Sequence, residues 1–304
     1  MSTKLAYIVP TMDRLEDLGK LLDSLAVQTR APEQIIVVDG GNQTVEALVA
    51  SYPNLPLTYV REYPPSLARQ RNAGMARLAP EISVAGYLDD DLVLEPDATE
   101  RMAKFWDNAE PEVGGAAFTI LNQPLVTGGS ISRFFLLNGK IPGRLLPSGW
   151  PSQIPTLGRT IETDWLYGGA TMWRREVIAE FSYDEWYLGH GYGEDVDFSY
   201  RVSRQFRLYV LAEAKVWHFT RPIRLASQHT LGRQQVVNRF YFIRKAGTFS
   251  EPAIAWAMFG QLIVNLAASL VRLDSAGLRR FMGNLSGLYA VIRGQTGQIG
   301  NYYK

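Results

Sequence analysis

The chain of 304 residues contains no cysteine. This absence excludes a disulfide framework, a thiolate zinc site and a cysteine nucleophile, and it fits a reducing compartment. No internal repeat is visible, and no signal peptide is expected, because the apolar run 5–9 is short and Pro10 follows it at once. With 46% hydrophobic and 20% charged residues, the chain is not disordered, and its length suits one large domain or about two ordinary ones.

The formal net charge of +1 conceals an uneven distribution. Residues 1–200 carry 16 Lys and Arg against 27 Asp and Glu, whereas residues 201–304 carry 15 against 3. An asymmetry of this size indicates that the C-terminal third faces something negative, such as a phosphate-rich ligand, an anionic membrane or nucleic acid.

The first 120 residues alternate the signals of strands and helices. Repeated βα units of this kind predict an α/β fold, with a mostly parallel central sheet and helices on both faces. In such sheets, ligands bind at the carboxyl ends of the strands. Apolar or β-branched runs predict strands at 5–9, 35–38, 57–60, 82–88 and 115–121, and periodicity predicts helices at 13–29, 44–51, 66–78 and 97–106.

Residues 122–162 are rich in Gly, Pro, Ser and Thr, which predicts a long loop of the kind that covers a binding site. Beyond it we expect strands ending at Trp173 and at 208–210 and 215–219, and helices from Arg174 and at 194–205. We therefore predict a first domain at 1–225, which the loop divides into 1–121 and 122–225, followed by a basic, helical extension at 226–304.

The run 253–271 contains no charged residue and approaches the length of about 20 residues that spans a membrane. Gln261, Asn265 and Ser269 recur every fourth residue, so they share one helix face. Because basic residues flank the run, the pattern favours a segment lying on an anionic membrane. Packing on the catalytic domain or in a homodimer, and a true span, stay open. Nucleic-acid binding explains the basic third less well.

The triplet Asp89-Asp90-Asp91 follows a predicted buried strand. In an extended chain, Asp89 and Asp91 point to the same side. Neighbouring carboxylates repel and raise each other's pKa, and Mg²⁺ or Mn²⁺ would remove that penalty and bridge a diphosphate. A solvated acidic turn is the alternative, which the preceding strand disfavours.

Asp39 also ends a strand, where it could bind a base or ribose or shape a turn with Gly40. Arg69 and Arg71 lie near a helix start and could contact a phosphate or a base, or form a solvated helix face.

Glu194 and Asp195 follow a glycine-rich approach at 189–193. A carboxylate there could act as a general base or stabilise the helix N-terminus. His218 lies in an apolar strand, where it is either a third metal ligand beside Asp91 or a core residue.

Taken in chain order, these motifs resemble glycosyltransferase family 2, whose members have the GT-A fold. The resemblance covers about residues 4–245. It implies that 1–225 is the catalytic domain, with a nucleotide-binding half at 1–121 and an acceptor-binding half at 122–225. The segments that carry it are Tyr-Ile-Val-Pro-Thr at 7–11, Ile-Val-Val-Asp-Gly at 36–40, Ala-Arg-Gln-Arg-Asn-Ala-Gly at 68–74, Leu-Asp-Asp-Asp at 88–91, Gly-Gly-Ala at 168–170 and Gly-Glu-Asp-Val-Asp-Phe at 193–198.

The resemblance implies an inverting enzyme that uses Mn²⁺ or Mg²⁺ to move a hexosyl or deoxyhexosyl group from a nucleoside-diphosphate sugar to an acceptor hydroxyl. It also assigns roles to residues. The nucleotide-sugar residues would be Pro10, Thr11, Asp39, Arg71, Asp89, Asp90, Gly169 and Ala170; the metal ligands would be Asp91 and His218; and the catalytic residues would be Asp195, as base, and Glu194 beside it.

The expected work is the synthesis of a surface polysaccharide or glycolipid on a saccharide or lipid-linked acceptor. The expected location is cytoplasmic, peripheral at the inner face of the cell membrane. One alternative is a nucleotidyltransferase, although the N-terminal region has no glycine-rich, lysine-bearing phosphate loop. Another is a catalytically silent protein that binds nucleotide sugars or serves as a membrane scaffold.

Overall fold

The computed structural model describes residues 2–123, 129–189, 191–222, 224–272 and 275–296. The chain falls into two compact units. The sheet unit comprises Met1–Pro124 and Pro155–Thr220, and the helical unit comprises Leu125–Ile154 and Arg221–Lys304. The compact units divide the chain differently from the predicted boundary at 225/226. The functional division at that boundary stays a prediction. Parts of the predicted loop at 122–162 and of the predicted extension at 226–304 lie outside the described residues.

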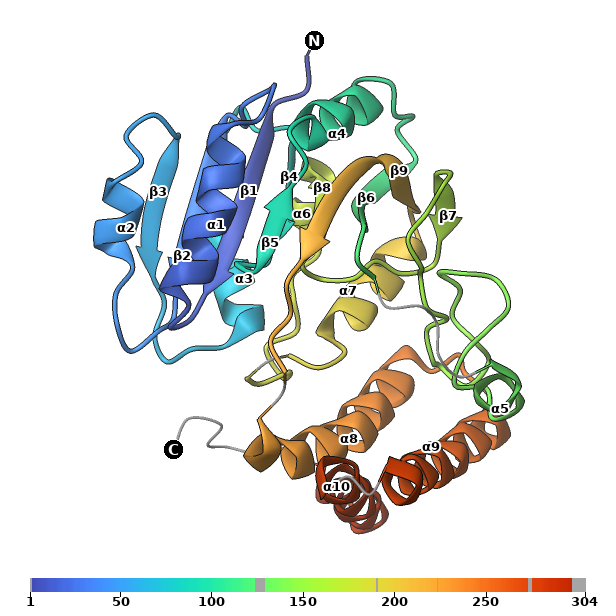
Figure 1. Ribbon diagram of the computed structural model, residues 1–304. Helices are drawn as coiled ribbons and strands as arrows, with labels where there is room; N and C mark the ends of the chain where they lie inside the picture. The colour runs from blue at the N-terminus through green and yellow to red at the C-terminus, as the bar shows by residue number, and fades with distance from the viewer. Residues whose placement is uncertain (1, 124–128, 190, 223, 273–274, 297–304) are drawn as a thin grey trace. The chain divides into compact units, whose positions relative to one another are not determined.

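The described part of the sheet unit contains a nine-stranded sheet with the order β3-β2-β1-β4-β8-β6-β9-β5, and β7 pairs with β9 (Figure 1). The strands are β1 (Leu5–Thr11), β2 (Gln34–Asp39), β3 (Leu57–Arg61), β4 (Val84–Leu88), β5 (Leu92–Leu94), β6 (Val113–Ile120), β7 (Ile161–Thr163), β8 (Ala170–Arg174) and β9 (Arg207–His218).

Parallel pairing joins β3, β2, β1 and β4. Beyond β4 the sheet is mixed. Strand β8 lies antiparallel between β4 and β6, while β9 is parallel to β6 and antiparallel to β5 and β7. The predicted α/β class is confirmed, and the parallel character belongs mainly to the first four strands.

Helices cover both faces of the sheet, which explains why the central strand β1 is buried along its whole length. Leucines at helical spacing in α1, from Leu18 to Leu25, join Met102 of α4 in one core with Tyr7 and Val9. Helix α3 packs on β1 and β2, where Gly74 leaves room for Ile8. The helices of this unit are α1 (Leu15–Ala26), α2 (Glu46–Ala50), α3 (Leu67–Met75), α4 (Ala98–Asp107), α6 (Arg175–Glu180) and α7 (Glu194–Ser203).

Three details of the sequence prediction were wrong. The two strands expected at 208–210 and 215–219 are one strand, β9, which crosses a register shift relative to β6. The short strand β5 was not expected, because its three residues follow the acidic triplet directly. The expected loop at 122–162 contains a helix, α5 (Gly129–Phe134), and the edge strand β7.

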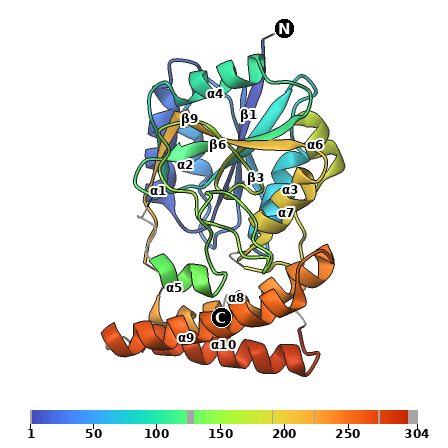
Figure 2. The ribbon, with the colours of Figure 1, turned by 90° about the vertical axis from the view of Figure 1, so that its right-hand side faces the viewer.

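The helical unit consists of α5, α8 (Gln228–Ala246), α9 (Glu251–Arg272), α10 (Ser275–Ile292) and a short 3₁₀ turn, η1 (Leu225–Ser227) (Figure 2). Helices α8 and α10 approach closely at glycines. A Cβ atom on Gly232 would lie 2.0 Å from the Arg280 carbonyl oxygen, and one on Gly283 would lie 2.0 Å from that of His229. Within the described residues, α9 alone is long and apolar enough to cross a membrane.

Candidate active site

Three neighbouring parallel strands end in polar residues at one edge of the sheet. Strand β1 ends at Thr11, β2 ends at Asp39 opposite it, and Asp89 follows the last residue of β4. Because the carboxyl ends of parallel strands meet at one edge, the fold brings together side chains that are far apart in the sequence. Pro10 is buried in β1, and Ala170 is buried at the start of β8, beside Leu88.

The three carboxylates of the acidic triplet have different surroundings. The Asp89 side chain is 30% exposed, whereas those of Asp90 and Asp91 are 6% exposed. Asp90 accepts a hydrogen bond of 2.7 Å from the Thr11 hydroxyl. Arg14 donates to Asp90 at 3.0 Å and to Asp91 at 2.9 Å. The buried Asp90 therefore has protein partners, and the nucleotide contact assigned to it stays a prediction.

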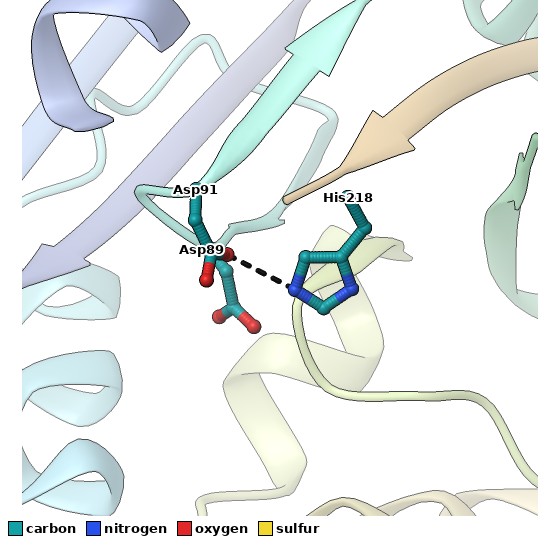
Figure 3. Close-up of side chains that lie close together, drawn as sticks. All are labelled: Asp89, Asp91 and His218. Atoms are coloured by element: carbon teal, nitrogen blue, oxygen red, sulfur yellow. Dashed lines mark ion pairs between the residues drawn. The ribbon is translucent and has the colours of Figure 1, made fainter. Parts of the chain in front are cut away.

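Asp89, Asp91 and His218 form a cluster in which one ligand atom from each residue lies within 4.8 Å of the others (Figure 3). His218 ends β9, which pairs with β5 so that His218 lies opposite Leu92. The Oδ1 atom of Asp91 is 3.0 Å from Nε2 of His218. No donor in the described part of the chain satisfies this buried Oδ1 with hydrogen-bond geometry. The three residues therefore fit a divalent cation.

The cluster shifts the titration of its members. Burial acts to lower the pKa of His218, but the carboxylates of Asp91 and Asp89 beside it raise it overall. Burial acts to raise the pKa of Asp91, and His218 and Arg14 lower it overall. In the absence of a cation, His218 is thus stabilised in its charged form, and a cation would have to displace that proton.

Asp39 is fully buried, and its carboxylate accepts hydrogen bonds from Gly41 N at 2.8 Å and Val45 N at 3.1 Å. Tyr59 donates to it at 2.9 Å, and Arg61 forms an ion pair with it at 2.7 Å. The carboxylate therefore shapes the loop after β2, and its contact with a nucleotide base stays a prediction. Sequence reasoning missed Tyr59 and Arg61, although both lie on β3, beside the end of β2.

Arg71 is 1% exposed and lies between carboxylates rather than on a helix face in solvent. Its guanidinium is 2.6 Å from Glu194 and 3.5 Å from Asp89. The rings of Tyr183 and Tyr87 lie 4.9 and 5.4 Å from the guanidinium carbon. Arg71 thus joins the acidic triplet to the start of α7, and its predicted nucleotide contact is untested. Its neighbour Arg69 pairs with Glu62 at 2.5 Å.

Gly168 and Gly169 lie close to the charged side chains of Arg71 and Asp89. A Cβ atom on Gly169 would lie 1.9 Å from a carboxylate oxygen of Asp89, and one on Gly168 would lie 2.7 Å from the Arg71 guanidinium. The Gly168 N–H donates to Asp195 at 3.2 Å. Only residues without a side chain allow Asp89 and Arg71 to approach the backbone this closely.

Glu194 and Asp195 occupy the first turn of α7, after Gly193 with a φ of 90°. Glu194 is buried, which raises the pKa of its carboxyl, and the charge of Arg71 opposes that rise. Asp195 is half-buried and accepts a second hydrogen bond, of 2.8 Å, from Val196 N. The structure therefore places the predicted base beside Gly168 and places Glu194 on Arg71.

A sequence model described as Glycosyl transferase family 2 matches residues 7–177, which is more than half of the chain. The chain belongs to glycosyltransferase family 2. In this glycosyltransferase, the matched range includes Asp39, Arg71 and the acidic triplet. Asp195 and His218 lie beyond its end. The nucleotidyltransferase alternative is thereby set aside.

Two curated relatives match parts of this glycosyltransferase. It is 31% identical over 108 residues to "Uncharacterized glycosyltransferase YwdF" of Bacillus subtilis strain 168, a match that covers 35% of this chain and 40% of that protein. It is 27% identical over 150 residues to an uncharacterized glycosyltransferase of Haemophilus influenzae strain Rd, covering 46% and 50%. The chain thus spans half or less of the length of these relatives.

Solved structures with low sequence identity share the fold of this glycosyltransferase. The mannosyltransferase PcManGT from Pyrobaculum calidifontis, in complex with GDP-Man and Mn²⁺, has a TM-score of 0.60 at 14% identity, covering 95% of this chain and 88% of that one. S. aureus TarS 1-349 in complex with UDP-GlcNAc has a TM-score of 0.53 at 15% identity, covering 99% and 93%. These likenesses confirm the predicted GT-A fold.

Proposed function

We propose that this enzyme is a metal-dependent, inverting glycosyltransferase that moves a sugar from a nucleoside-diphosphate donor to an acceptor hydroxyl. The observation that carries the proposal is the position of Asp89 and Asp195 at consecutive residues of one glycine pair, Asp89 against Gly169 and Asp195 hydrogen-bonded to Gly168. A displacement at a sugar carbon requires a carboxylate on the donor side and a base for the acceptor hydroxyl near one another.

Asp89, Asp91 and His218 are the residues that would hold the cation. A divalent cation held there supplies positive charge against the diphosphate that leaves. The carboxylates suit Mg²⁺ or Mn²⁺, and the imidazole favours a transition metal such as Mn²⁺. Support also comes from PcManGT, a neighbour that binds GDP-Man with Mn²⁺.

Asp195 takes the proton of the acceptor hydroxyl on a carboxylate oxygen. Its orientation is fixed by the N–H groups of Gly168 and Val196. Attack of the hydroxyl on the face of the sugar opposite the leaving diphosphate inverts the anomeric centre. Glu194, held by Arg71 at 2.6 Å, keeps the first turn of α7 in register with the acidic triplet.

The acceptor in this proposal is a saccharide or a lipid-linked saccharide, and the product belongs to a surface polysaccharide or glycolipid. The net positive charge of the C-terminal third supports an acceptor that carries phosphate or lies at an anionic membrane. The enzyme would then work at the inner face of the cell membrane.

The test is a panel of nucleotide sugars assayed with Mn²⁺, with Mg²⁺ and with excess EDTA. We expect hydrolysis or transfer with at least one donor, a higher rate with Mn²⁺, and loss of activity with EDTA. Nuclear magnetic resonance of the product should show the opposite anomeric configuration to the donor. Retention of configuration would refute inversion, and donor binding without any turnover would favour the catalytically silent alternative.

A further inference from the structure

Helix α9 exposes a stripe of large apolar side chains to solvent. Its buried side carries Ile254, Ala257 and Gly260 together with polar residues. Asn265 donates to Asn284 of α10 at 2.5 Å, and Ser269 is 6% exposed. The opposite stripe recurs at helical spacing and is exposed. Its large members are Trp256, Phe259, Ile263 and Leu270, with exposures of 38, 51, 38 and 65%. A helix that faces water carries polar side chains on its exposed face.

Helix α10 is built in the same way. Its buried side carries Gly283, Asn284 and Gly287, which pack on α8. The Asn284 amide donates to the Gly232 carbonyl at 2.8 Å. Its exposed stripe consists of Leu278, Met282, Leu285, Tyr289 and Ile292, which are 39 to 75% exposed.

Helix α5 adds a third exposed apolar element and is fixed to α9. Trp256 donates to the Phe134 carbonyl at 2.8 Å, and the rings of these two residues lie 5.2 Å apart. Gly260 leaves room for Phe135 beneath them. Phe134 and Ile131 nevertheless remain 65 and 64% exposed. These contacts fix α5 to α9 while apolar side chains of both helices stay exposed.

The positive charge of the helical unit indicates which partner covers its exposed apolar residues. The helical unit carries 14 Lys and Arg against 2 Asp and Glu, whereas the sheet unit carries 17 against 28. A second copy of the chain would bring the same excess positive charge to the contact and be repelled. An anionic lipid surface offers both apolar volume and negative charge.

Arg133 on α5 and Arg279 on α10 are exposed. Their charges limit how deeply these helices enter a bilayer. A guanidinium in the hydrocarbon core is costly, but at the interface its stem lies on apolar surface while its charge meets the headgroups. These positions favour helices lying in the plane of the membrane over helices that cross it.

We propose that the apolar stripes of α9 and α10, together with α5, dock the enzyme on an anionic lipid bilayer, with the helices in the interface. The inference rests on the proposed function only in that a docked transferase would meet a lipid-linked acceptor. We call these residues the docking surface.

The experiment is co-sedimentation of the full chain with vesicles of phosphatidylcholine alone or mixed with phosphatidylglycerol. We expect strong binding to the anionic vesicles that weakens with salt. Phe259→Asp and Met282→Asp should each weaken binding by about tenfold or more. Each removes apolar area that the bilayer would cover and adds a negative charge. Val27→Asp, which changes an apolar residue of the sheet unit that is 66% exposed, should leave binding unchanged.

Equal binding to both vesicles, or unchanged binding by both docking-surface variants, would overturn the proposal, as would a stable dimer that competes with lipid. Thermal melting shows that the variants are folded. Donor hydrolysis measured without lipid on the same samples separates the two proposals. Its absence in the wild type would contradict the proposed function alone, and its persistence in Phe259→Asp without vesicle binding would support docking.

Discussion

At the scale of single residues, two arginines hold the carboxylates of the site. Arg14 bridges Asp90 and Asp91, and Arg71 bridges Asp89 and Glu194. The carboxylates of Asp90, Asp91 and Glu194 are deeply buried, and such groups need charged or hydrogen-bonding partners. Sequence reasoning named the four acidic residues but missed Arg14, since 76 residues separate it from Asp90 and no local pattern links them.

Replacement of Arg14 by alanine should destabilise the protein, because it removes the guanidinium that pairs with both Asp90 and Asp91. The Arg14 side chain is one-third exposed, so we expect a loss of about 2 kcal/mol in the free energy of unfolding. Urea denaturation measures it. The matched control is Arg101→Ala, which breaks an exposed pair with Asp97 and should cost less than about 0.5 kcal/mol. Equal effects of the two changes would contradict this assignment.

Gly169→Ala should weaken metal binding, because the new methyl group would overlap the Asp89 carboxylate. Displacement of a group that orients a ligand typically reduces affinity about 10- to 100-fold. Titration with Mn²⁺ followed by calorimetry measures the change. Gly158→Ala is the control, because nothing lies within 4 Å of the added atom. A Gly169→Ala variant with wild-type affinity would show that Asp89 is not a ligand.

Asp90 should make stability depend on pH. Burial raises its pKa from 3.8 to about 7. Below pH about 4 the carboxyl is protonated in both states; as pH rises to about 7, the unfolded chain ionises first, so the free energy of unfolding falls. Asp90→Asn should flatten that decline, as measured by urea denaturation at several pH values. An unchanged slope would show that Asp90 is ionised in the folded protein throughout.

At the scale of elements, the sequence predicted the strands whose apolar runs are buried on both faces and the helix α1 with its leucine stripe. It did not predict which strands pair across long distances. Strand β9 was read as two strands, because Glu213 interrupts its apolar run, and α5 was read as loop, because its stability comes from Trp256 in a distant helix. Tertiary contacts, absent from local patterns, decide both cases.

The α8–α10 pair provides an element-scale test. A methyl group on Gly283 would lie 2.0 Å from a backbone oxygen of α8, which no side-chain rotation can relieve. Gly283→Ala should therefore separate the two helices and destabilise the helical unit by about 1–3 kcal/mol. Thermal unfolding followed by circular dichroism measures the effect. Gly129→Ala, whose added atom meets nothing within 4 Å, should have little effect; a neutral Gly283→Ala would contradict the close packing.

At the scale of the whole molecule, the division of charge follows the compact units. The opposed charges seen in the two parts of the sequence become an acidic sheet unit, which holds the proposed catalytic groups, and a basic helical unit, which holds the docking surface. The sequence revealed the asymmetry but suggested a single boundary along the chain. In the structure, Leu125–Ile154 belongs to the helical unit, although it precedes much of the sheet unit in the sequence.

In the proposed mechanism, Asp195 acts as the base of a metal-dependent sugar transfer. The most direct measurement compares wild type with Asp195→Asn for donor affinity, by calorimetry with Mn²⁺, and for turnover of the same donor. We expect donor affinity within about twofold and turnover reduced by about 10²-fold or more, the usual contribution of a general base. Turnover of Asp195→Asn equal to that of the wild type would show that Asp195 is not the base, and wild-type turnover undiminished in excess EDTA would show that no cation takes part.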